Sequence, residues 1–167
     1  MLTVSARGEQ TCRDCGFNWS IDIPEAIGLV AGAPDRYRAL LDAGLVVCSG
    51  DHEDWSAVGY LWHVVDVIRF GTERLWVLAL DPASGVPGWE QEALARERHY
   101  EALSPVVGLR ALDHAVRDWI EAACEAPADA EVEHAALGRL TTEDSIRRNA
   151  HEIQHHERDV RLRLGLE

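Results

Sequence analysis

The sequence lacks any long apolar run. No stretch of the 167 residues approaches the roughly 18 consecutive apolar residues of a membrane-spanning helix. The first residues, MLTVSARGEQTC, also lack the apolar segment of a secretory leader. We therefore expect a cytoplasmic protein in which the four cysteines are reduced.

Positive charge is scarce as well. The chain has 16 basic and 29 acidic residues, which gives a formal net charge of −13. Binding to nucleic acid depends on neutralising phosphates, and binding to an anionic membrane surface needs basic clusters. The charge balance argues against both partners.

Strand-type alternation is also rare, whereas Ala, Leu, Glu and Arg are abundant, as in helical proteins. Four amphipathic segments have helical periodicity and N-cap signals. They run from Asp22 to Gly44 (with a kink or break between Gly32 and Pro34), from Ser56 to Leu80, from Ser104 to just before Pro127, and from Thr141 to Gly165. The sequence predicts an all-α fold in which residues 21–167 form a four-helix bundle.

Two connections separate these helices. Residues 82–104 form a long connection with helical composition after Trp89, and this tryptophan either lines a pocket or anchors the loop. Residues 125–140 are predicted to be a linker or short helix. His52, His114 and His134 are expected to be solvated.

Residues 1–20 form a short N-terminal extension with a CxxC motif, Cys12 and Cys15, followed by Gly16. A zinc ribbon needs a second cysteine pair, which Cys48 and Cys124 do not provide, and a thioredoxin-type redox site needs a βαβ context. The simpler interpretation is a small turn or hairpin that caps the bundle, with Phe17 and Trp19 packed down.

The last predicted helix is rich in histidine and contains two overlapping i,i+4 pairs. Residues four apart lie on one face of a helix, so either pair could bind a metal ion. Glu152 and His156 border the apolar stripe and would face the bundle interior, whereas His151 and His155 would lie nearer solvent. Periodicity therefore favours Glu152 and His156, with His151 and His155 as alternates. A polar face that is merely rich in histidine also explains the pattern.

The second predicted helix carries His63 at the edge of a wide apolar arc, with Asp66 three residues later. A hydrogen-bonded core histidine would explain this position. His63 becomes a candidate ligand because another helix offers a matching cluster, and Asp66 could then orient an imidazole.

These motifs, Trp55-Ser56, Leu61-Trp62-His63-Val64-Val65-Asp66-Val67 and the histidine-rich last helix, resemble the DinB/YfiT-like superfamily over most of residues 21–164. The resemblance implies a divalent metal ion, zinc first and nickel second, held by three side chains. In the branch of mycothiol-dependent maleylpyruvate isomerase these match His63, Glu152 and His156, with Asp159 as a supporting residue. His151 and His155 form a competing pair in the commoner style of the superfamily, and the resemblance assigns no role to Cys12 and Cys15.

The function implied by this resemblance is a metal-dependent thiol S-transferase. It would join a low-molecular-weight thiol, such as mycothiol or bacillithiol, to an electrophilic small molecule. The alternatives are a hydrolase that uses metal-bound water and a non-catalytic metal-binding bundle with a role in stress response. Homodimerisation through helix faces is left open.

Overall fold

The computed structural model describes residues 10–44 and 55–166, so Cys48 and His52 lie outside the described residues. The elements in chain order are α1 (Ile23–Ala31), α2 (Ala33–Gly44), α3 (Ala57–Leu80), η1 (Pro82–Ser84), α4 (Gln91–Glu97), η2 (Tyr100–Ala102), α5 (Pro105–Glu125), β1 (Glu131–His134), β2 (Gly138–Thr141) and α6 (Thr142–Arg163).

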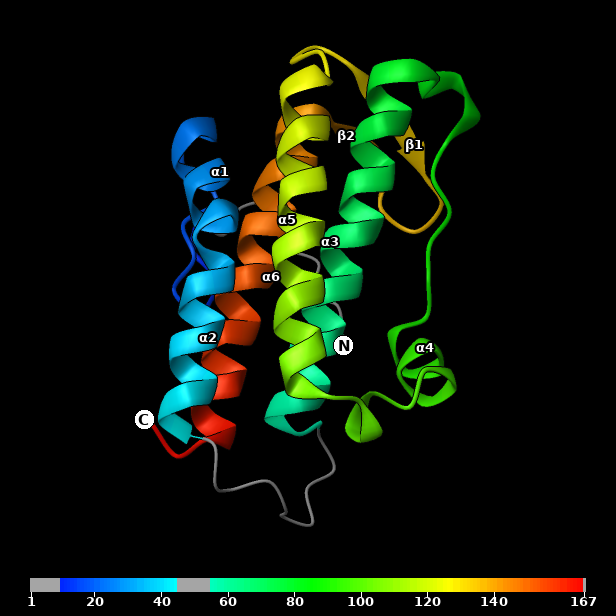
Figure 1. The fold of residues 1–167 in the computed structure, drawn as a ribbon. Coiled ribbons are helices and arrows are strands. Elements are labelled where there is room, and N and C mark those ends of the chain that lie inside the picture. The colour runs from blue at the N-terminus through cyan, green and yellow to red at the C-terminus, as the bar shows by residue number, and fades with distance from the viewer. Residues whose placement is uncertain (1–9, 45–54, 167) are drawn as a thin grey trace.

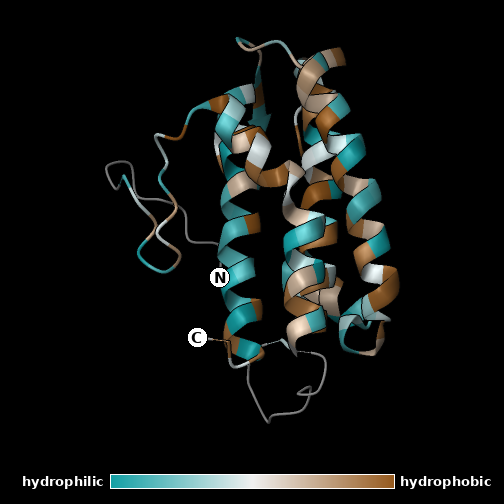
Figure 2. Ribbon diagram, turned by 60° about the vertical axis from the view of Figure 1, so that its left-hand side comes forward, coloured by the Kyte–Doolittle hydropathy of each residue, from teal (hydrophilic) through white to brown (hydrophobic). Residues whose placement is uncertain are grey.

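The long helices form a four-helix bundle, which confirms the predicted fold. Helices α1 and α2 follow each other end to end, on either side of Gly32, and together make up the first helix of the bundle (Figure 1). Helix α3 packs mainly against α5 and α6, α1 packs against α6, and α2 packs against α5. Each of these helices carries both hydrophilic and hydrophobic residues, as amphipathic helices do (Figure 2). Within the described residues, no helix is long and apolar enough to cross a membrane.

The helices begin where the sequence predicts, because side-chain oxygens satisfy the first free backbone N–H groups. The four capping residues of α1, α3, α5 and α6 are Asp22, Ser56, Ser104 and Thr141. Thr141 forms a capping box with Asp144, in which the side chain of each accepts a hydrogen bond from the backbone N–H of the other.

A close contact fixes α3 against α6. A Cβ atom added to Gly71 of α3 would clash with the side chain of Asn149 on α6, so a larger residue fits here only if Asn149 moves. Asn149 is buried, accepts a hydrogen bond from Nε1 of Trp119 at 3.1 Å and donates one to the carbonyl of Val67 at 3.4 Å. This polar contact sets the spacing of the two helices that carry the candidate ligands.

The segment between α5 and α6 corrects one prediction. Residues 131–141 form an antiparallel β-hairpin, β1 and β2, instead of a linker or short helix. His134 is buried because it faces inward from β1, in a strand where exposed and buried residues alternate. Its Nδ1 accepts hydrogen bonds from the backbone N–H groups of Ala136 and Leu137 in the turn, so this histidine stabilises the hairpin and is not solvated.

Candidate metal centre

His63 lies on α3 in the middle of the bundle and is fully buried, with 0% of its surface exposed. Neither Nδ1 nor Nε2 has a hydrogen-bond partner among the described residues. Burial lowers the pKa of His63 to about 3, and the neighbouring His156 adds to this effect. A neutral imidazole without a partner is a costly group to bury, and it is also the form that binds a metal ion.

Glu152 and His156 face His63 from α6. They lie one helical turn apart, with Nε2 of His156 3.3 Å from Oε2 of Glu152. The rings of His63 and His156 are perpendicular, with centroids 4.6 Å apart. One ligand atom from each of the three residues lies within 4.8 Å of the other two. We call His63, Glu152 and His156 the open site.

Asp159 contacts His156 from the next turn of α6. Its Oδ2 lies 2.9 Å from Nδ1 of His156, which leaves Nε2 directed toward Glu152. A carboxylate on the second ring nitrogen is the usual way to orient a histidine ligand.

The charges of the open site are tightly linked. Burial alone would raise the pKa of Glu152, but interactions with His151 and His156 hold it well below its usual range. Burial alone would lower the pKa of His156, but Asp159 and Glu152 raise it. Both carboxylates therefore favour the protonated form of His156.

The residues of the open site fit a divalent metal ion. Bond lengths of about 2.0–2.2 Å to nitrogen and oxygen separate ligand atoms by roughly 3.3–3.6 Å in a tetrahedral site, and the 3.3 Å between His156 and Glu152 agrees with this. His63 supplies the third donor, since neither of its ring nitrogens has a hydrogen-bond partner among the described residues. Two histidines and one carboxylate leave a coordination position free, which is typical of catalytic rather than structural zinc.

Aromatic side chains surround the open site. The ring of Trp55 lies 4.8 Å from that of His63, and the ring of Trp89 lies 5.7 Å away from it. Tyr60 stacks on His156 at 5.5 Å. Trp89 also packs on Phe70 at 4.7 Å, so it both anchors its connection and borders the site. The sequence pointed to Trp89 but not to Tyr60 or to the ring of Trp55 as part of the site wall.

Trp55 also borders a pocket of about 490 Å³. Residues 95, 96 and 99–102 of the long connection complete this pocket. Its walls therefore come from the segment that follows Trp89 and from the residue that contacts His63.

Asp66 has a different role from the predicted one. It is buried, but its carboxylate accepts hydrogen bonds from the hydroxyl of Tyr100 at 2.6 Å and from Arg98, and it pairs with Arg69 at 3.2 Å. It therefore fastens the long connection to α3 and does not orient an imidazole. Sequence spacing could not show this, because Arg98 and Tyr100 lie more than 30 positions away from Asp66.

His151 and His155 do not join the open site. They lie beside Cys12 and Cys15, and one ligand atom from each of these four residues lies within 4.8 Å of the others. The prediction that His151 lies near solvent is wrong, since only 4% of its surface is exposed. The N-terminal segment covers this face of α6, which helical periodicity alone cannot reveal. We call Cys12, Cys15, His151 and His155 the hairpin cluster.

The hairpin cluster has strongly shifted pKa values. Burial alone would raise the pKa of the Cys15 thiol. The imidazoles of His151 and His155 lower it instead, to about 6. Cys15 in turn raises the pKa of His155 to about 9.

His114 is exposed on α5, as the sequence predicts.

These observations define a class of protein: a four-helix bundle whose interior carries two histidines and one carboxylate as candidate metal ligands. The fold is that of a YfiT-like four-helix bundle. The chain is similar to YfiT from Bacillus subtilis, described as a probable metal-dependent hydrolase with an unusual four-helix bundle topology. The two are 14% identical, the match covers 87% of this chain and 91% of YfiT, and the TM-score is 0.71. Neither the family models nor the curated proteins that we compared contain a match.

Proposed function

We propose that the protein is a metal-dependent thiol S-transferase that uses the open site. The observation that carries this proposal is the fully buried His63, whose two nitrogens lack partners and which faces a glutamate and a histidine held by Asp159. A divalent ion bound there, zinc in the first instance, would favour the thiolate form of a low-molecular-weight thiol at the free position. Metal binding is supported by the donor set, and thiol transfer is the further step that we propose.

The charge of the ligand set suits an anionic nucleophile. Glu152 contributes the single negative charge among the three proposed ligands, and its pKa is far below its usual range. With a divalent ion the site would carry one net positive charge, which a thiolate would neutralise. His156 would bind the ion through Nε2 as a neutral imidazole, and Asp159 would hold the ring in place through Nδ1.

The surroundings favour an apolar or polarisable substrate. Trp55 and Trp89 exclude water from the side of His63, and the adjoining pocket of about 490 Å³ has room for a small molecule. We propose that the electrophile binds against Trp55, with its reactive carbon directed toward the open site. A thiol R–SH and an electrophile R′–X would give R–S–R′ and HX, so that one S–C bond forms as the C–X bond breaks.

Hydrolysis of a small substrate is the second candidate. It is favoured by the similarity in fold to YfiT, which is described as a probable metal-dependent hydrolase. The same three ligands would serve, but water would replace the thiol and no thiol would be required. A non-catalytic bundle, in which the ion only stabilises the fold, is the remaining alternative.

Metal content and conjugation together test the proposal. Metal should be measured by plasma mass spectrometry on tag-free wild type beside Glu152→Ala and His156→Ala. Conjugation of mycothiol, bacillithiol and cysteine to monobromobimane should then be followed by mass spectrometry, with the uncatalysed rate subtracted. We expect metal-stimulated conjugation in wild type and none in either variant, with His114→Ala as the control.

The results separate the three candidates. Metal-stimulated ester or amide hydrolysis without thiol would support the hydrolase instead. Bound metal that stimulates neither reaction would support the non-catalytic bundle.

A further inference from the structure

The N-terminal segment folds into a tight hairpin that presents two thiols from one turn. Thr11 and Asn18 pair as an antiparallel bridge. Inside it, the N–H of Cys12 donates to the carbonyl of Phe17 at 2.8 Å and the N–H of Gly16 donates to the carbonyl of Cys12 at 2.9 Å. Gly16 has φ of +71°, a conformation that favours glycine and lets the chain turn directly after Cys15.

Helix α6 presents two imidazoles to these thiols. His151 and His155 are one turn apart, and Sγ of Cys12 lies 3.8 Å from Nδ1 of His155. Bonds of about 2.3 Å to sulfur and 2.0 Å to nitrogen place such atoms roughly 3.5 Å apart in a tetrahedral site, so a small closure would admit an ion. Nε2 of His151 is buried and has no hydrogen-bond partner within the described part of the chain.

We propose that the hairpin cluster is a second metal site, a tetrahedral Cys2His2 zinc site that is separate from the open site and fastens the N-terminal hairpin to α6. The ligand spacing, CxxC followed by HxxxH, is one that structural zinc sites use. Four protein ligands close the coordination sphere, so this ion is structural. Each cysteine binds as thiolate and each histidine as neutral imidazole, and the protons that they carry pass to solvent.

The second nitrogens of both histidines already have carboxylate neighbours, as zinc-binding histidines do. Nδ1 of His151 lies 3.4 Å from Oε1 of Glu152, and Nε2 of His155 lies 3.9 Å from Oδ2 of Asp159. This leaves Nε2 of His151 and Nδ1 of His155 for the ion. The same two carboxylates also contact His156, so Glu152 and Asp159 link the two sites.

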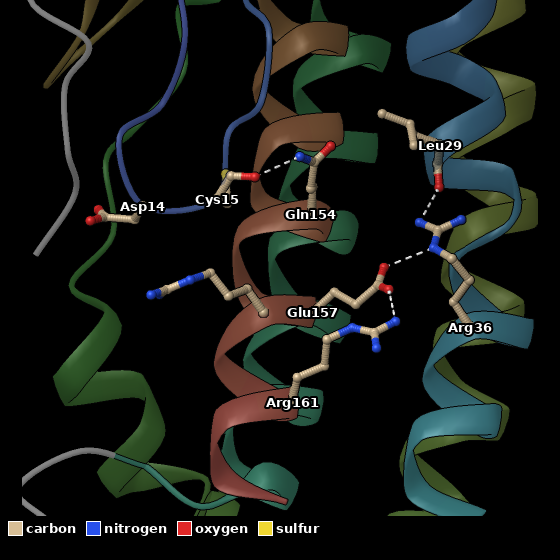
Figure 3. Close-up of a pocket in the computed structure, with 8 residues that line it drawn as sticks. Asp14, Cys15, Leu29, Arg36, Gln154, Glu157 and Arg161 are labelled. Carbon is tan, nitrogen blue, oxygen red and sulfur yellow. Dashed lines mark hydrogen bonds and ion pairs between the residues drawn. The ribbon is translucent and has the colours of Figure 1, made fainter. Parts of the chain in front are cut away.

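The hairpin is also seated on α6 by other contacts. Nε2 of Gln154 donates to the carbonyl of Cys15 at 2.9 Å (Figure 3). Trp19 stacks on His151 at 4.6 Å, and Phe17 meets the same ring edge-on at 5.4 Å. Aromatic cover on one side and a defined turn on the other hold the four donors in place without the ion, so the site is preorganised.

A disulfide-based redox site fits this geometry less well. A thioredoxin-type CxxC motif lies within a βαβ unit, whereas this motif lies in a hairpin. Two histidines complete the group.

Cobalt substitution of the full-length protein tests the proposal. Protein stripped with a chelator under reducing conditions is reloaded with Co²⁺, and metal content is measured alongside the absorption spectrum. We expect about two equivalents in wild type, thiolate-to-cobalt charge-transfer bands in the near ultraviolet, and intense visible bands typical of tetrahedral cobalt. His63→Ala should bind about one equivalent and keep the charge-transfer bands, since the thiolate ligands belong to the hairpin cluster.

The variant Cys12→Ser/Cys15→Ser should bind about one equivalent and lose the charge-transfer bands. The exposed Cys124 provides the matched control, and Cys124→Ser should behave as wild type. Wild-type protein without charge-transfer bands would overturn the proposal, and this result requires no variant to fold. Bands that survive in Cys12→Ser/Cys15→Ser would also overturn it. If only the open site failed to bind metal, wild-type protein would bind about one equivalent of cobalt and still show the charge-transfer bands.

Discussion

Two faces of one helix differ in what the rest of the chain brings to them. Glu152 and His156 meet a single donor, His63 of α3, whereas His151 and His155 meet two thiols from the N-terminal hairpin. The first set is incomplete and lies among aromatic rings beside a pocket; the second set is complete and is covered by Trp19 and the hairpin. The number of donors from outside α6 therefore separates a site suited to chemistry from one suited to structure.

This comparison also explains why two i,i+4 pairs overlap on α6. Successive residues of a helix point about 100° apart. The pair Glu152 and His156 and the pair His151 and His155 therefore face different parts of the protein. The two pairs are not alternative registers of one site, because each has its own partners.

The largest effect should come from His63→Ala. This change removes the only donor that α3 gives to the open site, and we expect metal-stimulated conjugation to fall at least about 100-fold, more than the loss of a supporting residue. Metal content should fall by about one equivalent. Full activity in His63→Ala would contradict the assignment, with His114→Ala as the reference.

Loss of the hairpin cluster should act on stability instead. An ion present at about 100 times its Kd stabilises a protein by ~2.7 kcal/mol, so Cys12→Ser/Cys15→Ser should lower Tm by roughly 5–10 °C in zinc-containing buffer. The difference should vanish when zinc is removed from both proteins. Scanning calorimetry with and without chelator measures it, and a Tm gap that persists in chelator would show that the cysteines act without metal.

Asp159→Asn should weaken both sites, because this carboxylate contacts His156 and lies near His155. Replacing such a supporting residue typically lowers metal affinity about 10- to 100-fold. Competition with a chromophoric chelator would measure this loss. Asp113→Asn on α5, which removes a carboxylate paired only with Arg110 and Arg117 among the described residues, should leave affinity unchanged.

Gly71→Ala should have the smallest effect and should separate the two sites. The added Cβ would press against Asn149 and move α3 from α6. Overpacking of this kind costs about 1–3 kcal/mol, measurable by urea unfolding. Metal affinity of the open site should fall while that of the hairpin cluster is unchanged. Gly28→Ala, where a Cβ meets nothing within 4 Å, is the control.

Much of the fold could be predicted because its signals are local. Asp22, Ser56, Ser104 and Thr141 cap the helices that they were expected to cap. The hairpin of the N-terminal extension was also expected, and Phe17 and Trp19 pack as predicted. Periodicity distinguishes Glu152 and His156 from the pair beside them, but it wrongly places His151 near solvent.

The remaining features depend on contacts between distant segments. The N-terminal cysteines lack a second cysteine pair, and their partners on α6 lie up to 143 positions away. His134 looked solvated because its segment is rich in alanine, yet the alternation Glu131, Val132, Glu133, His134 fits a short strand with two inward residues. Asp66 binds Tyr100 in the connection of residues 82–104, and the course of this connection cannot be predicted from sequence spacing.

The most direct test of two separate sites on α6 is anomalous diffraction at the zinc edge from crystals of the zinc-loaded protein. We predict two peaks, one bounded by His63, Glu152 and His156 and the other by Cys12, Cys15, His151 and His155. A single peak that draws ligands from both pairs of α6, or no peak at either position, would contradict this account.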